Sequence, residues 1–174
     1  MSPLSPDKIL SLFEEFARIH QRPLQILLVG GLSLYFYGMP DRATMDVDAE
    51  VKTGLEDLFH FLKEHHVPAD LSENFSGWSV IAMPPGYPER SSIAVQTGLL
   101  EIRILAPVDF IIAKLRRFTE IDIQDALFVA RKYQISPEAV KQTAESAISH
   151  SPKDTALFLF RKNVEEFFRL MKNV

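Results

Sequence analysis

The sequence contains no cysteine, which excludes disulfide bonds, zinc sites with thiolate ligands and cysteine nucleophiles. It also lacks a long hydrophobic run, since the longest nearly apolar stretch, residues 26–38, is too short to span a bilayer and contains three glycines. The first ten residues lack the basic and then apolar pattern of a secretion signal. We therefore expect a cytoplasmic protein with no membrane partner.

Positive charge is not in excess. The 19 lysines and arginines are outnumbered by 23 acidic residues, and the formal net charge is −4. This argues against a surface that is basic throughout and coats nucleic acid, although it leaves room for a local basic patch. The five histidines show no metal-ligand spacing, and no serine lies in a nucleophile elbow.

The segments that are present predict an α+β fold within the size of one compact domain. Residues 1–106 predict a mixed β-sheet flanked by helices, and residues 107–174 predict a helical C-terminal region packed on that core. The predicted helices cover residues 6–20, 32–37, 53–66, 107–118, 122–133, 136 onward and 151–172. The predicted strands cover residues 24–29, 45–51, 78–83, 91–97 and 99–105. Residues 67–77 are predicted as a loop or a weakly structured segment, and residues 84–88 as a loop.

The segment Leu27–Val51 combines two features that indicate chemistry. An apolar run ends at Gly30-Gly31, where we expect a strand to turn into a helix whose backbone N–H groups can bind an anion. Asp46 and Asp48 follow in a strand, and their spacing places both carboxylates on one face. Hard oxygen ligands of this kind suit a divalent metal, and the alternative is a solvated acidic face.

Arg42 and Thr44 lie just before Asp46 in the sequence. A guanidinium and a hydroxyl at these positions could contact phosphate oxygens. The segment therefore predicts a combined metal and nucleotide site.

This arrangement is similar to the signature GG-x-S … G … R-x-T-x-D-x-D of minimal nucleotidyltransferases in the DNA polymerase β-like superfamily, in the AbiEii-like, DUF6036-type branch. The resemblance extends from about Leu27 to Ala130 and implies a nucleotidyltransferase-type fold. The residues that carry it are Gly30, Gly31, Ser33, Gly38, Arg42, Thr44, Asp46 and Asp48, followed by Gly86, Tyr87, Arg90, Arg103, Asp109, Lys114, Asp122 and Asp125.

The resemblance implies transfer of a nucleoside monophosphate from an NTP to a hydroxyl or RNA acceptor, with Mg²⁺ or Mn²⁺ as the metal. Asp46 and Asp48 would be metal ligands and catalytic residues. The nucleotide-binding residues would be Gly30, Gly31, Ser33, Arg42, Thr44 and Lys114, of which Lys114 would also act in catalysis. For Lys114 the alternative is an exposed helix lysine paired with nearby acids.

A third carboxylate is expected by resemblance to enzymes that use two metal ions. Glu101 is the candidate as metal ligand or general base, and the alternative is a solvent-side pair between Glu101 and Arg103. Asp122 and Asp125 lie one helical turn apart and would support the site through Lys114, whereas the alternative for Asp122 is helix N-capping.

Two functions of different classes follow. The first is a Mg²⁺-dependent nucleotidyltransferase, which the resemblance also connects with bacterial toxin–antitoxin systems and hence with a cognate toxin or antitoxin partner. The second is a catalytically weakened nucleotidyltransferase-fold protein that acts as a binding partner or antitoxin. A nucleotide-sensing domain is a third option.

Overall fold

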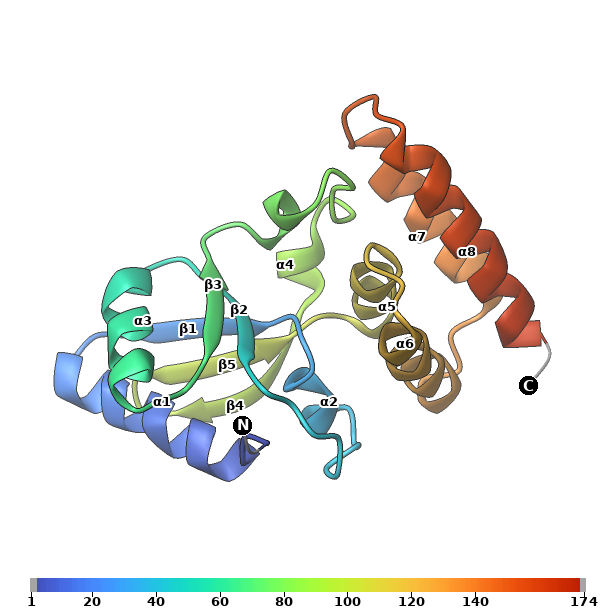
Figure 1. Ribbon diagram of the computed structural model, residues 1–174. Coiled ribbons are helices and arrows are strands. Elements are labelled where there is room, and N and C mark those ends of the chain that lie inside the picture. Colours follow the sequence, from blue (N-terminus) through green and yellow to red (C-terminus); the bar gives the residue numbers. More distant parts are fainter. Residues whose placement is uncertain (1–2, 173–174) are drawn as a thin grey trace. The chain divides into compact units, whose positions relative to one another are not determined.

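The structure is a computed structural model that describes residues 3–172, and it confirms the α+β architecture. The helices are α1 (Pro6–His20), α2 (Ser33–Phe36), α3 (Leu55–Glu64), α4 (Tyr87–Arg90), α5 (Pro107–Leu115), α6 (Glu120–Lys132), α7 (Pro137–Ser149) and α8 (Ala156–Lys172), and a 3₁₀ turn, η1, spans Phe75–Trp78. The strands are β1 (Leu24–Leu28), β2 (Val47–Val51), β3 (Ala69–Ser72), β4 (Ser92–Thr97) and β5 (Leu100–Ile104) (Figure 1).

The backbone divides into two compact units. The first comprises the residues up to Phe75 together with Ser91–Ile104, and the second comprises Ser76–Arg90 together with the residues from Leu105 onward. Within residues 3–172, no helix has both the length and the apolar character needed to cross a bilayer.

The first unit is built on a five-stranded mixed sheet with the strand order β3-β2-β1-β5-β4. The central strand β1 is antiparallel to β2 and parallel to β5, while β3 is parallel to β2 and β4 is antiparallel to β5. The Val29 N–H donates to the Asp48 carbonyl at 3.0 Å, so the end of β1 lies beside the start of β2. This pairing brings the segment after β1 next to the aspartates.

The two faces of this sheet differ in polarity, because side chains alternate along each strand. Ile26 and Ile102 lie level with each other and are completely buried. The other face carries Asp48, Glu101 and Arg103. Helices α1 and α3 contact each other and also contact β5 and β3, respectively. The polar face is therefore the one that can carry chemistry.

Helix α1 begins and ends at the signals that the sequence contains. The Ser5 hydroxyl accepts the Lys8 N–H at 3.5 Å, and Pro6 occupies the first helical position. Gln21, with φ of 50°, ends the helix in the left-handed conformation. Its buried side chains are Ile9, Leu12, Phe13, Phe16 and Ala17.

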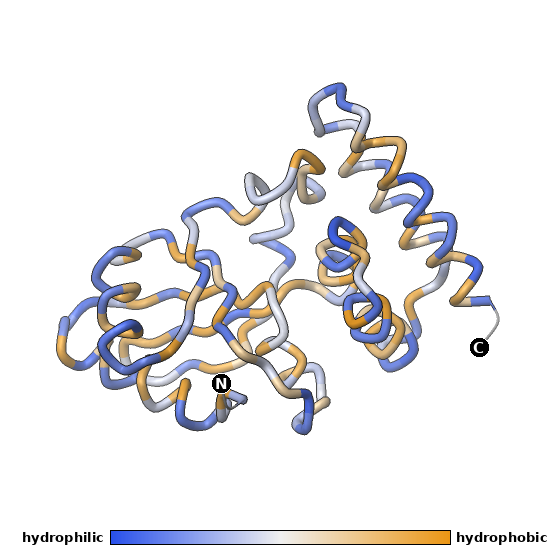
Figure 2. The backbone as a smooth tube through the Cα atoms, in the orientation of Figure 1, coloured by the Kyte–Doolittle hydropathy of each residue, from blue (hydrophilic) through white to orange (hydrophobic). Residues whose placement is uncertain are grey.

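The second unit is helical. Helix α5 contacts α6, α7 and α8, and α7 contacts α8. Figure 2 shows hydrophobic and hydrophilic stretches alternating along α7 and α8, as expected of amphipathic helices. The rings of Phe110, Phe160 and Phe167 are almost completely buried and form part of the core.

A bidentate ion pair fixes residues 84–90 to α5 in this unit. Arg90 donates to the two carboxylate oxygens of Asp109 at 2.9 and 2.8 Å, and it also donates to the Pro85 carbonyl at 2.7 Å. Asp109 has no exposed surface. Its hydrogen bonds raise the pKa of Arg90, so the guanidinium stays charged.

The predicted elements around residues 67–88 were wrong. Residues 67–77 contain β3 and most of η1, the predicted strand 78–83 is not a strand, and the predicted loop 84–88 contains the start of α4. The backbone N–H groups of residues 81–83 donate to serine hydroxyls and not to a neighbouring strand. Ile81 donates to Ser79, Ala82 to Ser151 and Met83 to Ser76.

Candidate metal and nucleotide site

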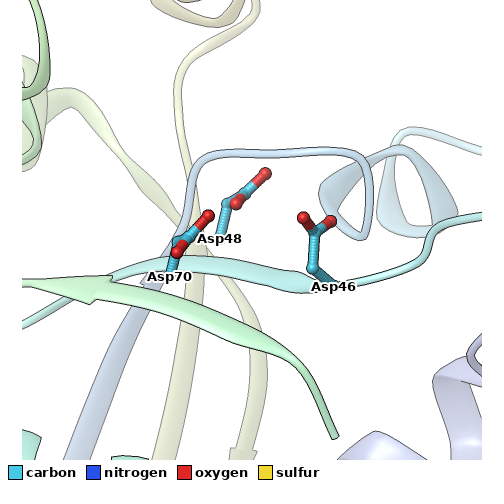
Figure 3. Close-up of side chains that lie close together, drawn as sticks. All are labelled: Asp46, Asp48 and Asp70. Carbon is cyan, nitrogen blue, oxygen red and sulfur yellow. The ribbon is translucent and has the colours of Figure 1, made fainter.

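Three carboxylates from two neighbouring strands come together on the polar face of the sheet. Asp46 precedes β2, Asp48 lies in β2, and Asp70 lies opposite Asp48 in β3 (Figure 3). One oxygen atom from each residue lies within 4.8 Å of the other two. Asp46 and Asp48 are half-buried, and Asp70 is exposed. Among residues 3–172, this is the only group of three or more acidic or histidine side chains close enough to hold a metal ion.

The glycine pair lies against this group. A Cβ atom at Gly30 would lie 1.9 Å from Asp48 Oδ2, so only glycine leaves the Asp48 carboxylate its present position. A Cβ at Gly31 would lie 3.0 Å from Thr44 Oγ1. The turn after β1 is therefore in direct contact with the segment that carries the aspartates.

Ser33 stabilises this turn, and Thr44 stabilises the segment that carries the aspartates. The buried Thr44 hydroxyl donates to the Asp46 carbonyl at 3.1 Å. The Ser33 hydroxyl, which is completely buried, donates to the Gly30 carbonyl at 2.6 Å. Both hydroxyls thus have a structural role. Arg42 is half-buried, and its guanidinium donates to the Ala43 carbonyl.

Glu101 lies elsewhere on the same face. It is level with Gln25 of β1, whereas Asp48 is level with Val29. Four residues along a strand correspond to about 13 Å. Hydrogen bonds from the Gln25 amide at 2.6 Å and from Arg103 at 3.1 Å lower the pKa of Glu101. Asp70, rather than the predicted Glu101, is the third carboxylate that the structure brings to the aspartate pair.

Lys114 belongs to a cluster in the second unit. Its buried ammonium donates to Asp122 at 3.2 Å and to Asp125 at 2.9 Å, which connects α5 to α6. The expected link between Lys114 and the two aspartates is therefore present, and Lys114 is buried instead of exposed. A contact between Lys114 and nucleotide stays a prediction.

Asp122 is also part of the capping box at the start of α6, in which Thr119 is the N-cap. Its side chain accepts the Thr119 backbone N–H at 3.1 Å, and Thr119 accepts the Asp122 N–H in return. Burial alone would raise the pKa of Asp122, but hydrogen bonds from Arg117 and Thr119 and the charge of Lys114 outweigh burial, so the pKa is lowered. Asp122 thus both completes the capping box of Thr119 and pairs with Lys114.

Comparison with known protein families gives a match to a family described as "Nucleotidyltransferase of unknown function (DUF6036)", and the match covers residues 7–172. The chain belongs to this nucleotidyltransferase family. No curated protein and no solved structure matches it. The resemblance read from the glycine and aspartate motifs is thereby confirmed at the level of the family, and a transferase activity that acts on a nucleotide follows from it.

The donor set of this nucleotidyltransferase fits a hard divalent cation. All three side chains offer carboxylate oxygens, with no sulfur or imidazole among them. Three like charges this close repel one another unless a cation lies among them. The group can therefore bind a divalent metal.

Sequence reasoning missed Asp70 because residues 67–77 were predicted as a loop. The sequence did contain a usable signal: when two strands are joined by a helix and lie side by side in a sheet, they run parallel to each other. Applied to β2, α3 and the residues after α3, that rule brings Asp70 close to Asp48.

Proposed function

We propose that this nucleotidyltransferase moves a nucleoside monophosphate from an NTP to an acceptor hydroxyl, on an RNA or another molecule, in a Mg²⁺- or Mn²⁺-dependent reaction. The observation that carries the proposal is the carboxylate group Asp46, Asp48 and Asp70 with Gly30-Gly31 packed against it. A divalent cation on these oxygens would neutralise the triphosphate and polarise the α-phosphorus.

The residues of the chain have separate tasks in this proposal. Asp46, Asp48 and Asp70 hold the cation. Gly30 and Gly31 have no side chains, so a triphosphate can approach the backbone there. The new bond joins the acceptor oxygen to the α-phosphorus, the bond from that phosphorus to the leaving pyrophosphate breaks, and the hydroxyl proton passes to a carboxylate oxygen of Asp70, the most exposed of the three.

The test is transfer of label from each α-labelled NTP in the presence of Mg²⁺ or Mn²⁺, with total RNA, protein and small hydroxyl compounds as acceptors. Asp46→Ala and Asp48→Ala should lose transfer and metal-dependent NTP binding. Asp57→Ala is the matched control, because Asp57 is an exposed aspartate in the first turn of α3 and is not part of the carboxylate group. If the wild-type protein neither binds nucleotide nor transfers label, the proposal fails.

The alternative function, a catalytically weakened relative that acts as a binding partner or antitoxin, rests on two points: the open choice between Glu101 as a ligand and Glu101 as a partner of Arg103, and the C-terminal helices, which offer faces to another subunit. Asp70 lies with the pair, which favours the catalytic proposal. A role in a toxin–antitoxin system, with a cognate partner, stays a prediction that rests on the resemblance.

A further inference from the structure

Glu50 is a buried carboxylate that follows Asp48 by two residues on the same face of β2. Its exposed fraction is only 3%. One oxygen, Oε1, lies 2.7 Å from the Lys52 ammonium, and the other, Oε2, accepts the Phe75 backbone N–H at 2.9 Å. A buried carboxylate is retained in a fold only when its oxygens are satisfied in this way.

Lys52 makes a second contact with the same stretch of backbone. Its ammonium donates to the Glu73 carbonyl at 2.6 Å. Glu50 and Lys52 together therefore hold the backbone of residues 73–75, directly after β3. We refer to the contacts of Glu50 and Lys52 with Glu73 and Phe75 as the β3 clamp.

The clamp acts on the strand that provides the third carboxylate. Strand β3 has four residues, lies at the edge of the sheet and, among the strands within residues 3–172, pairs with β2 alone. Short edge strands separate easily from a sheet, because only one side is hydrogen-bonded. Asp70 lies three residues before the first clamped residue, Glu73, so loss of the clamp would let Asp70 move.

We propose that Glu50 is a positioning residue for Asp70: through the β3 clamp it fixes the end of β3 and so places the third metal ligand beside Asp46 and Asp48. This proposal rests on the metal site of the proposed function. The sequence pattern Asp46-x-Asp48-x-Glu50 then contains two metal ligands and one residue that positions the third.

Charge alone would give Glu50 a different role. An extra negative charge near the site attracts a cation even when nothing is positioned, and Glu50→Gln and Glu50→Ala would then weaken metal binding equally. The clamp predicts a graded effect, because glutamine still offers an oxygen to the Phe75 N–H and alanine does not.

The experiment titrates Mn²⁺ into the 174-residue protein and measures free Mn²⁺ by electron paramagnetic resonance. Glu50→Ala should weaken Mn²⁺ binding about tenfold or more, the range found for residues that orient metal ligands. Glu50→Gln should weaken it by about threefold, the loss expected for one partly exposed ion pair. Glu14→Gln is the matched control, because it removes one charge and one hydrogen-bonded carboxylate from α1, in the same unit.

A double-mutant cycle separates positioning from a general loss of stability. Asp70→Asn should weaken Mn²⁺ binding, and Glu50→Ala should add less than about twofold in that background, because the ligand it positions is already lost. Hydrogen exchange of the peptide that covers residues 69–78 should be faster in Glu50→Ala and close to wild type in Glu50→Gln.

Equal losses in Glu50→Gln and Glu50→Ala, or independent losses in the cycle, would each overturn the positioning role while leaving the proposed transferase activity intact. No effect of Asp70→Asn on Mn²⁺ binding would overturn the positioning role and would also remove Asp70 from the proposed metal site. A wild-type protein that binds no Mn²⁺ would overturn the metal site, and the positioning role with it.

Discussion

A methyl group added at Gly30 tests the contact between the glycine turn and the aspartates most directly. In Gly30→Ala the new Cβ would lie 1.9 Å from Asp48 Oδ2, and Cβ atoms essentially never approach closer than 3.0 Å. The Asp48 carboxylate or the turn must therefore move by roughly 1 Å.

A displacement of that size is large for a group that positions a reacting centre. Misplacement by about 1 Å can lower a rate by about 100-fold, so kcat/KM for nucleotide transfer should fall by at least that factor. Mn²⁺ binding should weaken about tenfold, because one ligand leaves the group. Overpacking should lower the free energy of unfolding by about 1–3 kcal/mol.

The assay combines steady-state transfer, Mn²⁺ titration and urea unfolding on the same preparation. Gly31→Ala provides the comparison, because its Cβ would lie 3.0 Å from the Thr44 hydroxyl, and small adjustments can accommodate it. We expect a mild effect on Mn²⁺ binding and on the free energy of unfolding there, whereas nucleotide binding should weaken because a side chain now lies where the triphosphate approaches the backbone. If Gly30→Ala transferred nucleotide and bound Mn²⁺ as the wild type does, the proposed geometry of the site would be wrong.

Three further predictions concern the surrounding residues. Lys114→Met leaves the buried Asp122 and Asp125 without their ammonium partner and should lower the free energy of unfolding by roughly 3–5 kcal/mol, measured by urea titration, and a change below about 1 kcal/mol would contradict the described cluster. The pKa of Asp122 is lowered from its ordinary value of 3.8, so its contribution to stability is complete above that value and is lost as the pH falls below it. The free energy of unfolding, measured by urea titration, should therefore fall more steeply below pH 4 in the wild type than in Asp122→Asn. Parallel pH curves for the two proteins would contradict this. Glu101→Gln should leave Mn²⁺ affinity within about twofold of wild type, because Glu101 lies about 13 Å from Asp48 along the strands, and a tenfold loss would restore Glu101 as a ligand.

The parts of the fold that the sequence predicted correctly depend on local signals. Helix α1 has a serine cap, a proline at its first position and apolar residues at helical spacing. The hairpin of β4 and β5 has two strand-like runs on either side of Gly98, whose φ of 51° is one that glycine adopts easily. In both cases the residues that decide the structure are close together in the sequence.

Strand β3 could not be predicted in the same way. Its four residues contain an aspartate and a serine, and it is a strand because it pairs with β2, a partner about twenty residues earlier in the chain. Residues 78–83 were wrongly predicted as a strand, because their apolar residues alternate, but no strand pairs with them in the described part of the chain. Pairing between distant segments decided both outcomes.

In the candidate site too, local spacing was predictable from the sequence, whereas contacts that depend on strand pairing were not. Asp46 and Asp48 were predictable because two carboxylates spaced by two residues share a face of any strand. Gly30 was predictable as a turn, but its contact with Asp48 depends on the pairing of β1 with β2. Asp70 depends on β3, so the sequence pointed to Glu101 and not to the carboxylate that lies beside the pair.

Residues 76–90 belong to the second unit, although they lie between two segments of the first unit in the sequence. The polypeptide passes from one unit to the other three times, after Phe75, Arg90 and Ile104. A fragment ending near residue 106 would contain Arg90 but not its partner Asp109. It would also lose Arg116, which donates to the Ser76 carbonyl, and Ser151, which accepts the Ala82 N–H. The unit that carries the carboxylate group cannot be excised as one uninterrupted piece, and recombination between relatives would have to exchange residues 76–90 together with the C-terminal helices to keep these partners matched.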